Sequence, residues 1–474
     1  MPDQTIPRPP SATTGDGSTG VVERRAVTVF VVLLAAVLAA AAARGPVLAV
    51  IAVGLAAAVM ALAVLGRERM ALLAMIGAFA TAPMYKGIAP SPDTPITPTD
   101  LLFGVAVLLL VPTLIGRPVR LPMGYAIGVL IILTTGILST VFSPSPIISA
   151  LQFFQWLVVL VGLVGLLAIW APGWRIVDTL VWSYVAGHML STLYSPVGDK
   201  IANRAVGLTH HPNAFGEAGV MAFALTMYLW KRHDAVWYRV FVAGCAVLSV
   251  YSVVTSGSRA AAAVVAGLVV MVPFVERSAV KGFLLALLIA IGIVALPLLI
   301  DSSGDSSALS RLAGSGDAIV ADNARLNAQD FGIDMFLSHP VLGNGFAETI
   351  YVHNVVLGVA ASIGLVGLLG YLMVLFVMAR PIIGNHPRRR LTYVAWAFIA
   401  ITPTVPALED RTLWVAMAPA ILVAMNMRRL RPDDPFDVDP PDAAAVPADA
   451  PAGVPARTAS TASTATTATT EISR

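Results

Sequence analysis

The chain has 474 residues, of which 57% are hydrophobic and only 12% are charged, and its formal net charge is +3 at pH 7. Soluble domains carry about 25% charged residues, so a water-soluble protein of this size would have no place for so much apolar surface. This composition excludes an ordinary soluble enzyme, a secreted disulfide scaffold and a nucleic-acid binder. The single cysteine, Cys245, lies in an apolar run, which excludes a disulfide framework and a cysteine-based metal site.

Apolar stretches long enough to cross a membrane run through most of the chain. About 20 apolar residues cross a hydrocarbon core about 30 Å thick as a helix. We therefore expect an all-α fold, a polytopic transmembrane bundle of about 12 to 14 spans within residues 26–430. The candidate spans are roughly 26–43, 45–65, 70–88, 99–115, 122–141, 148–171, 176–194, 212–230, 236–255, 258–275, 282–300, 354–379, 391–407 and 411–427.

The basic residues predict the orientation, because cytoplasmic loops are rich in Lys and Arg. With the N-terminus inside and the spans alternating, 22 of the 30 basic residues fall in inside segments. We therefore expect a multi-pass protein of the inner (cytoplasmic) membrane with both termini in the cytoplasm. The eight basic residues left outside are Arg44, Lys86, Lys200, Arg204, Arg259, Arg311, Arg325 and Arg411.

Two polar tails flank the apolar region. Residues 1–25 are rich in Pro, Ser, Thr and Gly, and residues 431–474 begin acidic and Pro-rich before they pass into Ala/Thr repeats. Segments of this composition bury too little apolar surface to offset the entropy of ordering. Both are predicted to be disordered cytoplasmic tails.

The first cluster of candidate site residues lies before the predicted span 212–230. Arg204 stands on the outside against the charge bias, which calls for an anionic ligand or an ion partner. Pro212 presets the first helical turn, and His211 before it is biased towards an extended conformation. Asn213 is a turn-forming polar residue at this boundary, and Glu217 follows one turn later, where the helix dipole favours a carboxylate. The alternative is a well-capped helix start with an interfacial arginine.

The second cluster is the short turn Thr255-Ser-Gly-Ser-Arg-Ala260 between two apolar spans. Arg259 is placed at a helix start, where the dipole favours an acid over a cation. An anionic ligand bound to Arg259 and to the free N–H groups of this helix start would offset that cost. The alternative is an arginine whose side chain snorkels to the interface.

The third cluster lies in a long outer loop, residues 301–353. The spacing predicts an amphipathic helix over 323–338, ended by Pro340 and two glycines. A helix of this kind over the outer face is typical of a lid or a substrate platform, although a passive interfacial helix has the same pattern. The residues of its apolar stripe are Ala328, Phe331, Met335 and Phe336.

His353 and Asn354 follow the outer loop at the mouth of the next span. An unperturbed histidine titrates near neutral pH, so His353 is the best candidate for acid–base work, with a capping or packing role as the alternative. The sequence has no metal-ligand spacing and no phosphate-binding Gly-rich loop on the inner side. We therefore expect no metal and no cofactor.

At these three clusters the sequence resembles the O-antigen ligase and polymerase superfamily, polytopic glycosyltransferases of bacterial envelopes. The resemblance covers about residues 200–370. The family's Arg-x-x-Gly and Pro-Asn motif, its Ser-x-Ser-Arg turn, and its Arg-led helix with a Pro-x-x-Gly-x-Gly stop and His-Asn correspond in turn to Arg204, Gly207, Pro212 and Asn213; to Ser256, Ser258 and Arg259; and to Arg325, Pro340, Gly343, Gly345, His353 and Asn354.

The resemblance implies a glycan donor carried on undecaprenyl or a related polyprenyl diphosphate. The glycan would pass, at the outer face, to a hydroxyl on a lipid or on another glycan. Arg204 and Arg259 would then hold the diphosphate and stabilise the leaving charge, and His353 would accept or orient the acceptor's proton. Arg325 would contact the donor from the lid, and the remaining residues expected at the substrate are His211, Asn213, Ser258 and Asn354.

Two other function classes stay open on the residues alone. A transporter or flippase for lipid-linked sugars or small anions would also be apolar with outer arginines, but it should carry ionisable residues along a path through both halves. A non-catalytic scaffold for envelope assembly would tolerate mutation of all three clusters. The sequence does not separate a ligase from a polymerase.

Overall fold

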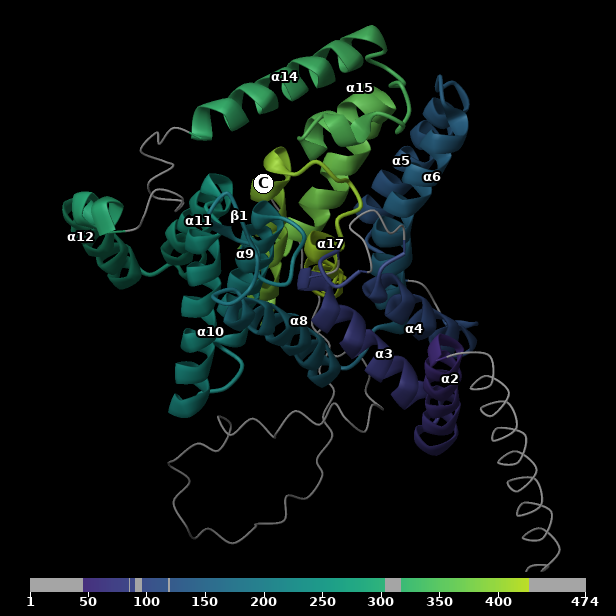
Figure 1. The fold of residues 1–474 in the computed structure, drawn as a ribbon, viewed down its shortest axis with the longest axis horizontal. Coiled ribbons are helices and arrows are strands. Elements are labelled where there is room, and N and C mark those ends of the chain that lie inside the picture. The colour runs from purple at the N-terminus through teal and green to yellow at the C-terminus, as the bar shows by residue number, and fades with distance from the viewer. Residues whose placement is uncertain (1–45, 85, 90–95, 118–119, 303–316, 426–474) are drawn as a thin grey trace, which may run out of the picture.

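The computed structural model describes residues 46–84, 86–89, 96–117, 120–302 and 317–425. The predicted span 26–43, both predicted tails and the first part of the predicted outer loop, with Arg311, lie outside these residues. Helices make up most of the described chain (Figure 1), so the predicted all-α class is confirmed. The strands that the structure describes are one antiparallel pair of two residues each, β1 (Lys200–Ile201) and β2 (Arg204–Ala205).

The first part of the chain forms a series of apolar helices. Pro98 opens α4 at the position where its missing N–H costs nothing, and Thr97 caps it. The Asp100 N–H donates to the Thr97 hydroxyl at 3.3 Å while the Thr97 N–H donates to the Asp100 carboxylate at 3.0 Å, a capping box. These helices are α2 (Pro46–Leu65), α3 (Arg67–Thr81), η1 (Ala82–Met84), α4 (Pro98–Leu114), α5 (Met123–Val141), α6 (Pro146–Leu157), the π-helical turn η2 (Val158–Leu163) and α7 (Val164–Trp170).

In the second part of the chain, α8, α10, α11, α16 and α17 all pack against α9. Nearly every residue of α9 is buried, and two glycines on it allow close packing. A Cβ at Gly216 would lie 2.9 Å from the Ser258 Cβ, and one at Gly219 would lie 3.0 Å from the Ser249 carbonyl oxygen. The elements of this part are α8 (Trp174–Tyr194), α9 (Pro212–Leu229), α10 (Val236–Thr255), α11 (Arg259–Glu276), α12 (Ala279–Ser302), α14 (Asp317–Ser338), η3 (Thr349–Tyr351) and α15 (Val355–Ala379), followed by η4 (Arg380–Ile383), η5 (Arg389–Thr392), α16 (Tyr393–Ile401), η6 (Thr402–Thr404), α17 (Arg411–Met417) and α18 (Ala420–Ala424).

Five helices in the described part of the chain are long and apolar enough to cross a membrane. Other predicted spans coincide with helices that are too short for this, such as α3 with 15 residues and α16 with nine. The architecture is therefore that of a helical membrane protein. The five candidate spans are Met123–Phe142, Pro146–Trp170, Val236–Thr255, Arg259–Glu276 and Val355–Ile383.

The helix predicted over 323–338 lies within α14, which begins at Asp317 and ends at Ser338. In Figure 1, α14 runs across the end of the bundle rather than through it, and it packs against α15. Its half-buried face includes Ala328, Met335 and Phe336 as predicted, but it is centred on the buried Gly332. Phe331 departs from the predicted stripe, because its side chain remains 39% exposed.

The segment after α14 is fixed to an interruption in α15. Gly364 leaves the helical conformation with φ 68° and ψ −173°, a region that is essentially restricted to glycine. The backbone before this interruption binds the loop: the N–H groups of Asn344 and Gly345 donate to the carbonyl oxygens of Ala361 and Ser362 at 2.9 and 3.0 Å. Phe346 is fully buried and stacks on Phe153 of α6 with ring centroids 4.8 Å apart. The loop that carries α14 is thus anchored in the core.

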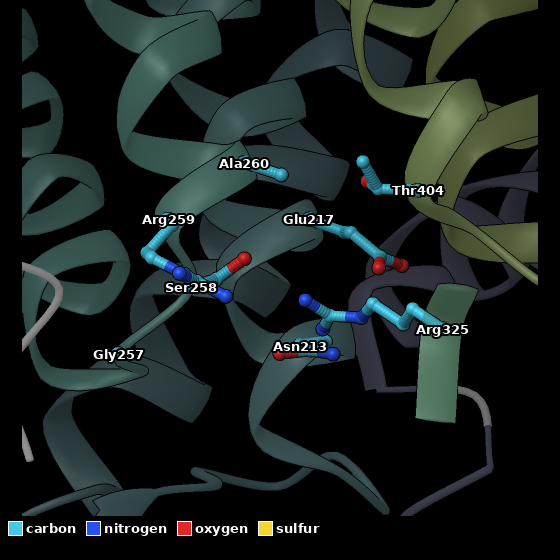
Figure 2. Close-up of a pocket in the computed structure, with 8 residues that line it drawn as sticks. All are labelled: Asn213, Glu217, Gly257, Ser258, Arg259, Ala260, Arg325 and Thr404. Atoms are coloured by element: carbon cyan, nitrogen blue, oxygen red, sulfur yellow. The ribbon is translucent and has the colours of Figure 1, made fainter. Parts of the chain in front are cut away.

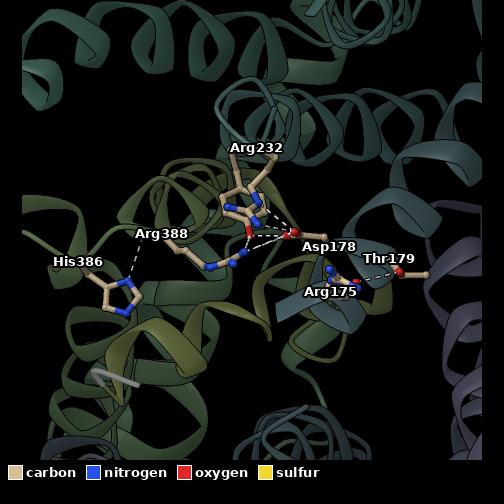
Figure 3. Close-up of polar contacts among 7 residues, drawn as sticks. Arg175, Asp178, Thr179, Arg232, His386 and Arg388 are labelled. Atoms are coloured by element: carbon tan, nitrogen blue, oxygen red, sulfur yellow. Dashed lines mark hydrogen bonds and ion pairs between the residues drawn. The ribbon is translucent and has the colours of Figure 1, made fainter. Parts of the chain in front are cut away.

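A buried ion cluster joins three segments near the start of α8 (Figure 3). Asp178 of α8 accepts hydrogen bonds from Arg232 Nε at 2.9 Å and from Arg388 at 3.4 Å, and from the hydroxyl of Tyr228. Arg388 also lies over the Trp174 ring, 4.5 Å from its centroid. Since the Arg388 side chain is only 8% exposed, its charge depends on Asp178 for compensation.

Replacing Asp178 tests this cluster. We expect Asp178→Asn to lower the free energy of unfolding by about 2 kcal/mol, less than the 3–5 kcal/mol for a fully buried pair because the carboxylate is 19% exposed. The measurement is thermal unfolding of the purified protein in detergent. Asp234→Asn is the matched control, because the Asp234 side chain is 97% exposed where it pairs with Arg239. Equal melting temperatures for the two variants would contradict the prediction.

Candidate functional site

The turn between α10 and α11 is built by two buried serines. The Ser258 N–H donates to the Ser256 hydroxyl at 3.2 Å, and the Ala261 N–H donates to the Ser258 hydroxyl at 3.4 Å, which caps α11. Gly257 between them adopts φ 63°, which suits a residue without a side chain. Arg259 is therefore the first residue of α11, at the helix start where the sequence placed it.

Arg204 connects this turn to the start of α9. Its Nε donates to the Ser256 carbonyl oxygen at 2.6 Å, and its guanidinium also donates to the side-chain oxygen of Asn213. Asn213 lies in α9 and Ser256 lies in the turn before α11, 52 positions away from Arg204 in the chain. The first two sequence clusters are therefore brought together by one guanidinium.

The start of α9 is capped by His211. The ring Nδ1 accepts the N–H of Asn213 at 3.1 Å, and the hydroxyl of Thr209 donates to the His211 carbonyl at 2.9 Å. Pro212 is the first residue of the helix, as predicted. This cap fixes the backbone from which Asn213 extends towards Arg204.

A pocket of about 290 Å³, its open mouth included, lies between the starts of α9 and α11 (Figure 2). Arg325 enters it from α14, so the third sequence cluster meets the other two here. Figure 2 shows the side chains of Arg325 and Glu217 entering the same space, with the Arg325 guanidinium extending towards Asn213. The residues that line the pocket are Asn213, Glu217, Gly257, Ser258, Arg259, Ala260, Arg325 and Thr404.

Two lining residues were not predicted to belong to the site. Glu217 was expected only to favour a helix start, but its side chain is buried and interacts electrostatically with Arg325 and Asp410. A carboxylate within the apolar run of this helix was a usable signal, because buried acids are rare without a partner. Thr404 comes from η6, and its sequence carries no comparable signal.

His353 and Asn354 lie beside this pocket and are not among its lining residues. Asn354 caps α15, since its side-chain oxygen accepts the N–H of Leu357 at 3.1 Å. His353 is exposed and adopts φ 52°, an uncommon conformation for a residue with a side chain. His353 is nevertheless within electrostatic range of Arg325 and His211.

The histidines around the pocket are neutral near pH 7. Partial burial, followed by the positive charge of Arg204 and of other nearby groups, lowers the pKa of His211 to about 4. Partial burial and then Lys86 lower the pKa of His210 to about 4. Neighbouring atoms partly desolvate the ring of His353, although the residue is at the surface, and this and then the charge of Arg325 lower its pKa. The local positive charge therefore comes from guanidinium groups.

The arrangement is suited to holding an anion. Arg259 and Arg325 line the pocket together with one carboxylate, Glu217. Arg204 is not a lining residue, but its guanidinium is hydrogen-bonded to Asn213 of the wall. The N–H groups at the start of α11 add the positive end of a helix dipole. The pocket is much smaller than a typical ligand site, so it has room for part of a charged group and not for a whole glycan. Within the described ranges, no group of three or more His, Cys, Asp or Glu side chains could hold a metal ion.

Comparisons with protein-family models and with curated proteins found no match to this chain.

The pH dependence of stability tests the environment of His211. A histidine with an unperturbed pKa near 6.5 takes up a proton in the unfolded chain well before a folded histidine whose pKa is about 4. Stability should therefore fall as the pH is lowered from about 6.5 to about 4. In His211→Asn, which keeps a good helix cap, we expect a smaller fall in melting temperature over this range. The same pH dependence in both proteins would contradict the assignment.

Proposed function

We propose that this protein is an integral-membrane glycosyltransferase of the O-antigen ligase and polymerase superfamily. It transfers a glycan from a polyprenyl-diphosphate donor to a hydroxyl on a lipid or on another glycan, during synthesis of a cell-envelope polysaccharide. The reaction takes place at the outer face of the cytoplasmic membrane, and both termini of the enzyme are in the cytoplasm. The donor and the acceptor are its partners, and the enzyme uses neither a metal nor a cofactor.

The observation that supports the proposal is the meeting of Arg259 and Arg325 in one pocket, with Arg204 bonded to its wall. Arg259 begins α11, Arg325 enters from α14, and Arg204 is hydrogen-bonded to the residues that shape the wall between them. Guanidinium groups bind phosphate oxygens in a bidentate manner, and a diphosphate offers oxygens to more than one of them. The apolar helices around the pocket supply a place for the polyprenyl chain.

The proposed reaction is a displacement at the anomeric carbon of the donor. The acceptor hydroxyl oxygen forms a bond to that carbon while the bond between the carbon and the phosphate oxygen breaks. The electron pair of the broken bond goes to the polyprenyl diphosphate, whose growing negative charge Arg204 and Arg259 stabilise. Arg325 contacts the diphosphate from α14, and Glu217 orients that guanidinium in the pocket.

His353 accepts the proton that the acceptor hydroxyl loses. A histidine can act as a base only in its neutral form, and the lowered pKa of His353 favours that form near pH 7. His353 is exposed beside the pocket, where a bulky acceptor can approach from the aqueous side. Asn213 and Ser258 line the pocket and would contact the substrate, while His211 and Asn354 cap the helices that carry the site.

Removing an arginine from the pocket tests the proposal. We expect Arg259→Gln and Arg325→Gln each to lower the rate of glycan transfer by about 10²-fold or more, since each removes a donor to the leaving diphosphate. The assay uses purified protein with a polyprenyl-diphosphate-linked glycan and an acceptor, and binding of polyprenyl diphosphate is measured in parallel.

Lys200→Gln is the matched control, because Lys200 is an exposed cation of β1 that does not line the pocket. It should transfer glycan at the rate of the unsubstituted protein. Unchanged binding and transfer in Arg259→Gln would refute the role of the arginines. Movement of the lipid-linked glycan across proteoliposomes without formation of a glycosidic bond would favour a transporter instead.

Substitution of His353 tests the acid–base role separately. His353→Ala should lower kcat by about 10²- to 10⁴-fold while polyprenyl diphosphate still binds. The unsubstituted enzyme should lose activity as the pH falls through an apparent pKa below 6.5, because protonation removes the base, and the variant should lack this limb. His339→Ala is the control, since His339 is also an exposed histidine of the same segment. Full activity in His353→Ala would exclude the role.

A further inference from the structure

A second, larger cavity lies at the other end of α9, α10 and α11. It encloses about 1150 Å³, its open mouth included, and its wall is apolar. Phe223 and Met227 of α9 face Val242 of α10 and Val272 of α11 across it. A wall of this kind suits a hydrocarbon chain, because such a chain has no polar group that needs a hydrogen-bond partner.

The cavity exists because α10 presents small side chains to it. Ala243 and Ala246 line it where larger residues would fill the space between the helices. Val247, also on its wall, is 67% exposed, so the cavity is open at the outer surface of the bundle. In a helical membrane protein that surface is in contact with lipid chains.

The mouth of the cavity carries a net positive charge. Lys231, Lys281 and Arg390 line it together with a single carboxylate, Glu276. Glu276 is shared, since the Lys281 ammonium lies 3.1 Å from its Oε2 and Arg390 pairs with its other oxygen. Three cations against one anion leave two positive charges for a ligand.

This basic mouth lies on the membrane face opposite the arginine pocket. Helix α11 begins at Arg259 in that pocket and ends at Glu276 in this cavity, a length of 18 residues. At 1.5 Å per residue this is about 27 Å, close to the thickness of a bilayer core. α14 lies across the end of the bundle where α11 begins (Figure 1), so the two sites do not share ligands.

We propose that this cavity binds an anionic phospholipid from the leaflet opposite the arginine pocket. One acyl chain lies between α9, α10 and α11, and the phosphate is bound by Lys231, Lys281 and Arg390. Long basic side chains at helix ends reach the headgroup level, and Trp230 at the mouth is of the residue type enriched there. An anionic headgroup gains from each cation, whereas a zwitterionic headgroup of the same chains gains much less.

Native mass spectrometry of the full chain in mild detergent tests this site. The probes are phosphatidylglycerol and phosphatidylcholine with identical acyl chains. We expect phosphatidylglycerol to be retained about tenfold more tightly, and the double variant Lys231→Gln/Lys281→Gln to lose this preference. Ala246→Phe, which fills the cavity and leaves the charges in place, should lower retention of phosphatidylglycerol by a similar factor.

Arg239→Gln is the control, because Arg239 is a basic residue near the same end of α10 that does not line the cavity. Its preference should equal that of the unsubstituted protein. Equal retention of the two phospholipids, or an unchanged preference in the double lysine variant, would overturn the proposal. Polyprenyl phosphate held more tightly than phosphatidylglycerol, with the same sensitivity to the lysines, would overturn the choice of a phospholipid. Glycan transfer is not part of this measurement. Its result therefore tests the phospholipid site independently of the proposed reaction.

Discussion

One guanidinium group fixes the geometry on which the candidate site depends. Arg204 donates to the Ser256 carbonyl and to the Asn213 side chain, and so it holds the starts of α9 and α11 side by side. The close packing of Gly216 against Ser258 brings the same two helices together from within. Because both helices point their N-termini at one small space, the positive ends of two dipoles and the Arg259 side chain meet there. An arginine at this position combines a structural and an electrostatic contribution that a lysine, with its single ammonium, would not reproduce.

The sequence was most informative where local signals coincide with helix ends. The predicted range 212–230 agrees with α9 (Pro212–Leu229), since Pro212 opens the helix, and 236–255 matches α10. The helix over 323–338 was also predicted, although α14 begins six residues earlier. Periodicity and breakers carry this information, because both act within a few residues.

Features that depend on tertiary contacts were beyond such reasoning. The range 354–379 looked like one continuous span, but Gly364 interrupts α15 where Pro340 and Asn344 bind its backbone. For the site, the three sequence clusters indicated the right segments, yet nothing in their spacing could place Arg325 beside Glu217. Asn354 was expected at the substrate, and its side chain caps α15. A capping residue and a ligand-binding residue share the same chemistry, so only the position of neighbouring elements distinguishes them.

The attachment of α14 has a mechanical consequence for the pocket. This helix is held near its C-terminal end, where Gly332 lies against Val352 and Leu357 and where Asn344 contacts the carbonyl oxygen of Met335. Arg325 is seven positions before Gly332, so about 10 Å of helix separates it from this point of attachment. Tilting α14 by about 10° about this point would displace the Arg325 backbone by about 2 Å. A shift of this size is enough to make or break a hydrogen bond in the pocket. A small tilt of this one helix would therefore change how many guanidinium groups surround a bound anion.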